Sequence, residues 1–305
     1  MKSYVVGVDV GGTNIKLGIV QAAGKVTART SFATKPFASS RIKLIHGLAA
    51  QIGSILSSKG ISKKQVAGVG IGLPGPIDHE RGVVRFLPNI PGWDNVPLKS
   101  ILQKKLGLPV FIDNDVKIIT LAEWKFGAGR GVSDLVCLTL GTGVGSGLIL
   151  ENRLYRGCAN AAGELGHLPL NETGPACNCG GYGCLETYIG NRALLPRAQQ
   201  VLKRPVTLEE MSALARAGNS AALRFWHEAA THLGNGLVAV VNLLNPRLIV
   251  IGGGVANNHR FLFPTAKEVI TRRAMKTQAQ SVKIVRAALG DDAGIIGGHV
   301  LVNNA

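Results

Sequence analysis

The stretch YVVGVDVGGTNIKLGIV at residues 4–20 predicts an apolar β-strand, a glycine-rich turn and an apolar return strand. The same pattern recurs in LVCLTLGTGVGSGLIL at residues 135–150, where the turn again combines glycine with threonine. A duplicated strand, turn and strand, each copy followed by helical segments, indicates two similar α/β lobes that face each other across a cleft. We expect phosphate to bind between the two turns.

The remaining segments supply the other elements of the two lobes. Residues 4–34 predict a meander of three antiparallel strands, and apolar residues at helical spacing predict a helix over residues 41–58. Further strands are expected at 65–73, 109–113, 248–251 and 282–285, and further helices at 116–126, 224–244 and 293–301. We place the N-terminal lobe at residues 1–120 and the larger lobe at 121–289.

The composition is that of a globular protein, with 305 residues and 46% hydrophobic content. Neither a signal peptide nor a membrane span is recognised, so we expect a cytoplasmic protein without a membrane partner. The formal charge of +16 attracts polyanions, including nucleotides, polyphosphate and nucleic acid. Aromatic residues make up only 5% of the chain and the basic residues are dispersed, which disfavours nucleic-acid binding.

The first turn follows Asp9 and contains Gly11, Gly12 and Thr13. Successive backbone N–H groups in such a turn suit phosphate oxygens, and a carboxylate at the strand end suits Mg²⁺ or its waters. A single turn of this kind fits an ordinary hairpin equally well, with glycine at positive φ. The second copy at 141–145 favours phosphate binding, because turn chemistry alone does not explain two such hairpins at matching places.

The strand at 109–113 runs into three polar residues, because it ends on Asp113 and is followed by Asn114 and Asp115 before a helix. Ligands bind at strand ends in α/β proteins, and a carboxylate there can accept a proton from an attacking hydroxyl group. In the structural alternative, Asp113 or Asn114 caps the helix. That alternative applies less to Asp115, which is the candidate base.

The most specific pattern runs Glu-x-x-His and then Cys-x-Cys-Gly-Gly-Tyr-Gly-Cys-x-Glu, from Glu164 to Glu186. One imidazole and three thiolates make a complete tetrahedral zinc set, which leaves no open position for water. We therefore expect structural Zn²⁺ held by His167, Cys177, Cys179 and Cys184. The alternative is a cluster of inert cysteines, but the glycines between the thiols allow the tight turns that chelation requires.

Together with Gly252-Gly253-Gly254, these motifs resemble the ROK family of sugar kinases and repressors over nearly the whole chain. The resemblance implies a two-lobed actin-like ATPase and hexokinase fold, which is ribonuclease H-like, with a C-terminal helix at about 290–305 that returns to the first lobe. It implies an ATP-dependent kinase that uses Mg²⁺ and phosphorylates the 6-hydroxyl of a hexose, with glucose as the preferred hypothesis. Dimers are usual in the family, so a homodimer is expected.

The resemblance also implies roles for individual residues, with Asp115 as the catalytic base. The sugar-binding residues it implies are Gly75, Asn89, Asn114, Glu164, His167 and Glu186. His167 would serve zinc and sugar through its two nitrogens. The residues it implies for the nucleotide and its metal are Asp9, Gly11, Gly12, Thr13, Lys16, Thr142, Gly143, Gly253 and Gly254, the last two beside the adenosine.

Two departures from the family pattern bear on these roles. Val116, Lys117 and Ile118 follow Asp115 where many members carry small residues and Asn, which is expected to alter the packing behind the base. Repressors of the family carry a helix-turn-helix before the first glycine turn, whereas here that turn comes directly after Asp9, so no DNA partner is expected. The alternatives are an N-acetylmannosamine or N-acetylglucosamine kinase, a kinase that uses polyphosphate, and a sugar-sensing regulator without turnover.

Overall fold

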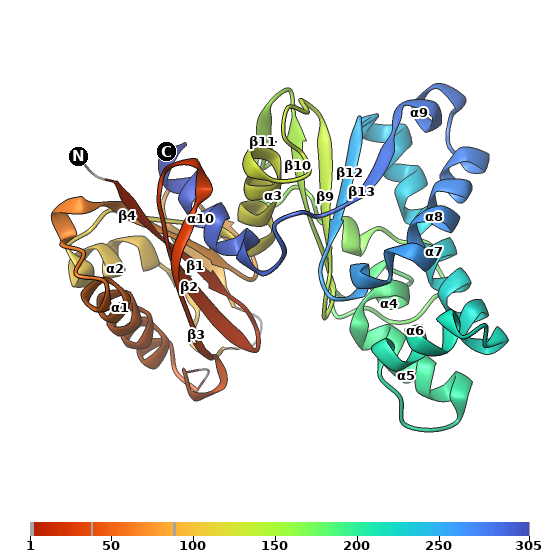
Figure 1. Ribbon diagram of the computed structural model, residues 1–305, viewed down its shortest axis with the longest axis horizontal. Helices are drawn as coiled ribbons and strands as arrows, with labels where there is room; N and C mark the ends of the chain where they lie inside the picture. The colour runs from red at the N-terminus through yellow and green to blue at the C-terminus, as the bar shows by residue number, and fades with distance from the viewer. Residues whose placement is uncertain (1–2, 38, 88–89, 305) are drawn as a thin grey trace. The chain divides into compact units, whose positions relative to one another are not determined.

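The computed structural model describes residues 3–37, 39–87 and 90–304 (Figure 1). The chain folds into two compact units. The first comprises Met1–Gly131, Leu154–Ala162 and Ala288–Ala305, and the second comprises Val132–Arg153 and Gly163–Ala287. Among the described residues, no helix is both long and apolar enough to cross a bilayer.

The first unit is built on a five-stranded sheet with the order β3-β2-β1-β4-β8. Its strands are β1 (Tyr4–Val10), β2 (Asn14–Val20), β3 (Val26–Ala33), β4 (Val66–Leu73) and β8 (Val110–Asn114). The first three strands form the predicted antiparallel meander, whereas β4 runs parallel to β1 and β8 runs parallel to β4. The carboxyl ends of β1, β4 and β8 therefore lie along one edge of the sheet.

Among the residues that the structure describes, four α-helices and a small sheet complete the first unit. The helices are α1 (Arg41–Ser58), α2 (Leu98–Leu106), α3 (Asp115–Phe126) and α10 (Ala293–Asn303). The small sheet contains β5 (Ile77–Asp78), β6 (Val83–Phe86) and β7 (Asp94–Val96). Helix α10 packs against β1, β4 and α3, so the C-terminal segment is part of the first unit's core (Figure 1).

The second unit is built on a sheet with the order β11-β10-β9-β12-β13. Its strands are β9 (Leu135–Leu140), β10 (Val144–Leu150), β11 (Arg153–Tyr155), β12 (Leu248–Gly252) and β13 (Lys283–Arg286), although the division into units counts Leu154 and Tyr155 of β11 with the first unit. Its helices are α4 (Glu186–Ile189), α5 (Asn191–Leu202), α6 (Leu208–Arg216), α7 (Ser220–Leu244), α8 (His259–Arg273) and α9 (Lys276–Ser281). Short 3₁₀ turns in the chain are η1 (Ala22–Gly24), η2 (Lys35–Phe37), η3 (Lys63–Gln65), η4 (Leu165–His167), η5 (Val255–Asn258) and η6 (Gly290–Asp292).

The two sheets share one topology. In each, an antiparallel hairpin, β1–β2 or β9–β10, is followed by two more strands that extend the sheet in parallel, β4–β8 or β12–β13. In each hairpin a glycine turn joins the two strands. The duplication predicted from the two glycine turns is therefore confirmed.

Each unit has its own apolar core. In the first, helix α1 begins where the Ser40 hydroxyl accepts the N–H of Ile42 at 3.2 Å, and its inner face buries Leu44, Leu48 and Ile52 completely. In the second, α7 buries Trp226 to the same degree. Full burial of one such apolar side chain stabilises a fold by roughly 1.5–3 kcal/mol, so these faces fix the helices on their sheets.

Candidate active site

The carboxyl edge of the first sheet brings three candidate positions into register. Asp9 in β1 lies opposite Gly72 in β4, and Gly72 lies opposite Asp113 in β8. Adjacent strands are about 4.8 Å apart, so the backbones of Asp9 and Asp113 are roughly 10 Å from each other. Asn114 and Asp115 follow at the same edge. Two carboxylates, Asp9 and Asp115, thus share one end of one sheet.

Helix α3 begins at this edge with Asp115 in its first turn. The side-chain oxygen of Asn114 accepts the N–H groups of Val116 and Lys117 at 3.0 and 3.2 Å, so Asn114 is the N-cap of the helix. The capping alternative left open for Asn114 is therefore confirmed. Its amide nitrogen donates to the carbonyl of Gly75 at 3.2 Å. Capping uses the oxygen, so contact with a ligand falls to the second hydrogen of the amide.

Asp115 is oriented by its own helix terminus. Its Oδ1 accepts the N–H of Val116 at 2.9 Å, and the side chain is only partly buried. A Cβ on Gly72 would lie 3.1 Å from the Cα of Asp115 and 2.3 Å from Cδ1 of Ile118. Only glycine at position 72 lets the first turn of α3 pack this closely on β4, and this packing brings Asp115 to the sheet edge.

Two basic side chains lie behind this edge: Arg156, which belongs to no motif of the sequence, and Lys117, which follows Asp115 in α3. Arg156 pairs with Asp113 at 2.7 Å, and the Asp113 side chain is only 1% exposed. Lys117 is also buried, and its amine donates to the backbone carbonyl of Asn160. Asp113 therefore caps nothing: its Oδ2 receives Arg156, and its Oδ1 accepts the N–H of Asn114 at 2.8 Å. Lys117, one of the residues noted after Asp115, thus packs toward Asn160 behind this edge.

Asp9 has an unusual electrostatic environment. Burial raises the pKa of Asp9, and the nearby Lys16 partly offsets this by lowering it. The amine of Lys16 itself pairs with Asp291 at 2.7 Å, and this contact lowers the pKa of Asp291. Lys16 thus lies beside Asp9, but in this structure it binds a carboxylate of the C-terminal segment.

The first glycine turn is fixed by β3 and the residue after it. The N–H of Gly11 donates to the carbonyl of Asn14 at 3.0 Å. Thr34 binds the turn twice, because its hydroxyl donates to the carbonyl of Gly11 and its N–H donates to the carbonyl of Thr13, both at 2.8 Å. Gly12 and Thr13 are exposed. The carbonyls of the turn are therefore occupied, while its tip faces outward.

The second glycine turn is fixed by the start of α5. The N–H groups of Asn191 and Arg192 donate to the carbonyls of Gly141 and Thr142 at 2.9 and 3.2 Å. The N–H of Gly141 donates to the carbonyl of Gly143 at 2.9 Å. As in the first turn, donors from neighbouring segments bind the carbonyl groups. Both turns are therefore held in place through their carbonyl groups.

Glu186 is anchored to the second turn. Its Oε2 accepts the N–H of Val144 at 2.8 Å. A Cβ on Gly143 would lie 2.1 Å from that same oxygen, so the absence of a side chain at position 143 makes room for the carboxylate. The structure thus brings together a candidate sugar residue, Glu186, and a candidate phosphate residue, Gly143. The sequence placed them in separate motifs.

The predicted zinc ligands converge. The ligand atoms of His167, Cys177, Cys179 and Cys184 all lie within 4.8 Å of one another. Cys179 and Cys184 have their sulfurs 3.7 Å apart, and Nδ1 of His167 lies 3.5 Å from the sulfur of Cys177. A tetrahedral centre with Zn–S of about 2.3 Å and Zn–N of about 2.0 Å requires separations of about 3.8 and 3.5 Å. The four side chains therefore fit Zn²⁺ with Nδ1 as the histidine ligand.

The thiols differ in acidity. Burial, followed by contacts with the neighbouring thiols, raises the pKa of Cys184 to about 12. The backbone N–H of Gly181 and the Cys177 thiol lower the pKa of Cys179. A metal ion that binds here must displace the proton of Cys184, because thiolates and not thiols are zinc ligands.

The remaining candidates are placed individually. Gly75 lies in the turn after β4, where its carbonyl receives Asn114. Glu164 is exposed and directly precedes η4, and its carbonyl accepts the N–H of His167, the last residue of η4, at 3.0 Å. Gly253 and Gly254 follow β12 and precede η5. Asn89 lies outside the described residues.

The comparisons with known proteins agree with this geometry. The family profile for ROK matches residues 5–305. The chain belongs to the ROK family. A glucokinase of Thermotoga maritima is 32% identical to this ROK protein over 99% of the chain and 98% of its own length. A xylose repressor of Caldicellulosiruptor bescii is 33% identical over 96% of the chain and 76% of the repressor.

A solved ROK structure shows the same fold. The ROK family glucokinase from Streptomyces griseus, crystallised with glucose and AMPPNP, matches with a TM-score of 0.83 at 32% identity. The match covers 99% of this chain and 100% of that one. This ROK chain therefore has the α/β, two-lobed actin-like ATPase fold, and the predicted fold class is confirmed.

Proposed function

We propose that this protein is an ATP-dependent hexose kinase, with glucose as its preferred acceptor, and that it transfers the γ-phosphate to the sugar 6-hydroxyl. The observation that carries this proposal is the sheet edge shared by Asp9 and Asp115. Phosphoryl transfer requires a group that orients the attacking hydroxyl and a cation near the phosphates, and this edge offers a carboxylate for each task. The similarity to glucokinases supports a sugar kinase.

Asp115 acts as the general base. Its partly exposed carboxylate accepts the proton of the 6-hydroxyl while the hydroxyl oxygen bonds to the γ-phosphorus and the bond from that phosphorus to the oxygen of ADP breaks. Asn114, fixed by the cap and by Gly75, directs an amide hydrogen at the sugar. The anchoring of both residues in a helix terminus preorganises the base before the sugar arrives.

Asp9 would hold Mg²⁺ or its coordinated waters. Its carboxylate is a hard oxygen ligand of the kind that Mg²⁺ prefers, and it stands directly before the phosphate turn. Bound Mg²⁺ would neutralise charge on the transferred phosphate. The nucleotide phosphates contact Gly11, Gly12, Thr13, Lys16, Thr142 and Gly143, and the adenosine lies by Gly253 and Gly254. When nucleotide binds, the amine of Lys16 would leave Asp291 and contact a phosphate group instead.

The other sugar contacts come from the zinc-braced loop. His167, Cys177, Cys179 and Cys184 would hold Zn²⁺ as a structural ion, because they supply four protein ligands. With Nδ1 of His167 on the metal, its Nε2 is left to the sugar, alongside Glu164 and Glu186. Gly75 and Asn89 complete the proposed set.

Two other functions compete with a glucose kinase: a kinase for a different sugar, and a regulator that binds sugar without phosphorylating it. An N-acetylhexosamine kinase would use the same sugar-binding residues, and the similarity to a xylose repressor favours a sugar-sensing regulator. A panel of glucose, mannose, N-acetylmannosamine, N-acetylglucosamine and xylose in a coupled ADP assay distinguishes them. We expect turnover with glucose and ATP. Sugar binding without turnover on any acceptor would establish a regulator instead, and turnover with polyphosphate in place of ATP would change the donor.

A further inference from the structure

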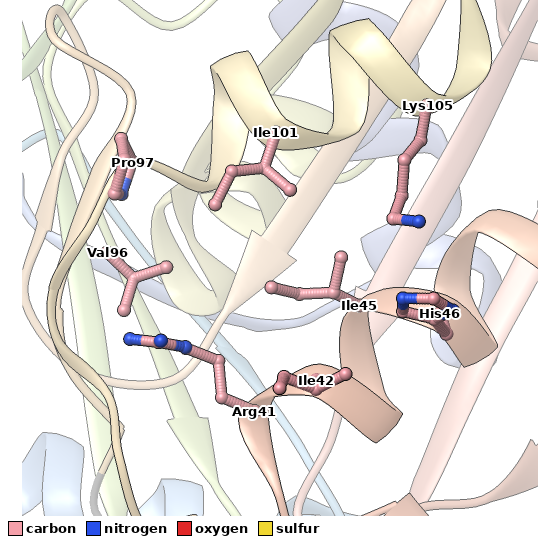
Figure 2. Close-up of a pocket in the computed structure, with 8 residues that line it drawn as sticks. All are labelled: Arg41, Ile42, Ile45, His46, Val96, Pro97, Ile101 and Lys105. Carbon is pink, nitrogen blue, oxygen red and sulfur yellow. The ribbon is translucent and has the colours of Figure 1, made fainter.

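A cavity of about 270 Å³ lies between α1, α2 and the end of β7, and its lining includes neither Asp9 nor Asp115 (Figure 2). The N-terminal part of α1 and the helix α2 supply most of its walls. The residues that line it are Arg41, Ile42, Ile45, His46, Val96, Pro97, Ile101 and Lys105. None of them has a role in the proposed kinase reaction.

The middle of the cavity is apolar. Ile45 and Val96 are 5% and 2% exposed and belong to the core of the first unit. Ile101 packs against that core from α2. Ile42, in contrast, is 63% exposed although it lines the same cavity. An apolar body laid on these isoleucines would cover surface that water now contacts, which is the driving force for apolar binding.

The ends of the cavity are basic. Figure 2 shows Lys105 and His46 at one end, with Arg41 at the other and the isoleucines between them. Arg41 already donates to the carbonyl of Gly92 at 3.2 Å, whereas Lys105 and His46 are exposed side chains on neighbouring helices. The eight lining residues include no carboxylate. The charge therefore complements an anionic head at the end formed by Lys105 and His46.

We propose that this cavity binds a small amphipathic monocarboxylate, with its carboxylate beside Lys105 and His46 and its apolar chain on Ile42, Ile45 and Ile101. The cavity is smaller than the roughly 300–1,000 Å³ typical of sites for drug-sized ligands, so a short acyl chain fits it better than a larger ligand. The formal charge of +16 favours the approach of an anion. This inference does not depend on the proposed kinase activity.

Octanoate is the probe, and the isoleucine δ1-methyl signals of the full-length protein are the readout. Octanoate is expected to shift the methyl signals of Ile42, Ile45 and Ile101 in a saturable way. Octanol, which lacks the charge, and acetate, which lacks the chain, are expected to bind more weakly. Equal affinity for octanol and octanoate, shifts centred on other isoleucines, or no shift at all would each overturn the proposal.

A matched pair of variants tests the head-group contact. Lys105→Gln is expected to weaken octanoate binding roughly two- to fivefold, as expected for one exposed ion pair. Lys104→Gln removes a neighbouring lysine that is also exposed but does not line the cavity, and it is expected to leave the affinity unchanged. If both variants weaken binding equally, the effect is general surface charge and the assigned site is wrong. If neither variant changes the affinity, Lys105 does not bind the carboxylate and the proposal also fails.

Discussion

Arg156 donates to Oδ2 of Asp113 twice, from Nη2 at 2.7 Å and from Nε at 3.1 Å. The pair joins the segment Leu154–Ala162 to the end of strand β8, directly before Asn114 and Asp115. The Arg156 side chain is 20% exposed and that of Asp113 is 1% exposed, so the pair is largely withdrawn from solvent. It fixes the strand end from which the proposed base projects.

Removing only one partner of this ion pair is predicted to destabilise the fold. Arg156→Met leaves the carboxylate of Asp113 buried and unpaired, which is expected to lower the free energy of unfolding by about 3 kcal/mol. Removing both charges with Asp113→Leu and Arg156→Met should recover part of that loss, since no unpaired charge remains. Urea unfolding measures both. Arg153→Met, at an exposed position in β11, is the control. A single variant as stable as the wild type would refute the structural role.

Zinc is predicted to depend on all three clustered thiols. Cys179→Ser is expected to remove zinc from the purified protein, as measured by elemental analysis. Cys158→Ser, at an exposed cysteine outside the cluster, should retain it. Because burial raises the pKa of Cys184 to about 12, zinc must displace a proton, and its affinity should fall as pH falls. Full zinc occupancy in the Cys179 variant would contradict the assignment.

The ionised carboxylate of Asp9 is predicted to lower the stability of the fold while it supports turnover. Its raised pKa means that the folded chain holds this proton more tightly than the unfolded chain does, so ionised Asp9 lowers stability at neutral pH. Asp9→Asn should therefore raise the urea midpoint at pH 7 and reduce turnover with Mg²⁺ and ATP. The gain in stability should disappear as pH falls below 3.8, the ordinary pKa of Asp. A variant that is less stable than the wild type at pH 7 would show that the charge is compensated.

Gly143 is predicted to be needed for the position of Glu186. Gly143→Ala places a methyl group where the Glu186 carboxylate lies and should displace it from the N–H of Val144. Loss of one sugar contact to a charged group is expected to weaken glucose binding about tenfold, measured calorimetrically without nucleotide. Gly141→Ala is the matched control, because a Cβ there meets nothing within 4 Å. Unchanged glucose affinity in the Gly143 variant would remove Glu186 from the sugar site.

Elements with strong local patterns were predictable from the sequence. Helix α1 has the predicted bounds, Arg41–Ser58, because apolar periodicity and the Ser40 cap both act locally. Helix α7 begins at Ser220 and not at residue 224, because Asn219 caps it by accepting the N–H of Ala222. The strands β5, β6 and β7 were not predicted, since strands of two to four residues are too short to show periodicity.

The candidate site was predictable where its residues form contiguous motifs. The zinc ligands fall within one short stretch of chain, and their convergence follows from tight glycine turns. The pairing of Arg156 with Asp113 was not predictable, because it joins positions 43 residues apart and Arg156 belongs to no motif. The buried Glu123 was missed for the same reason. Its carboxylate accepts the N–H of Leu289 at 2.8 Å, 166 residues away.

Asp115 is the proposed base for phosphoryl transfer, and the turnover of Asp115→Asn with glucose and ATP tests this role. The amide keeps the size of the side chain and an oxygen for the N–H of Val116, but it cannot accept the proton. We expect kcat to fall by a factor of about 10²–10⁴ while glucose binding is retained. A variant whose kcat stays within about a factor of two of the wild type would contradict it.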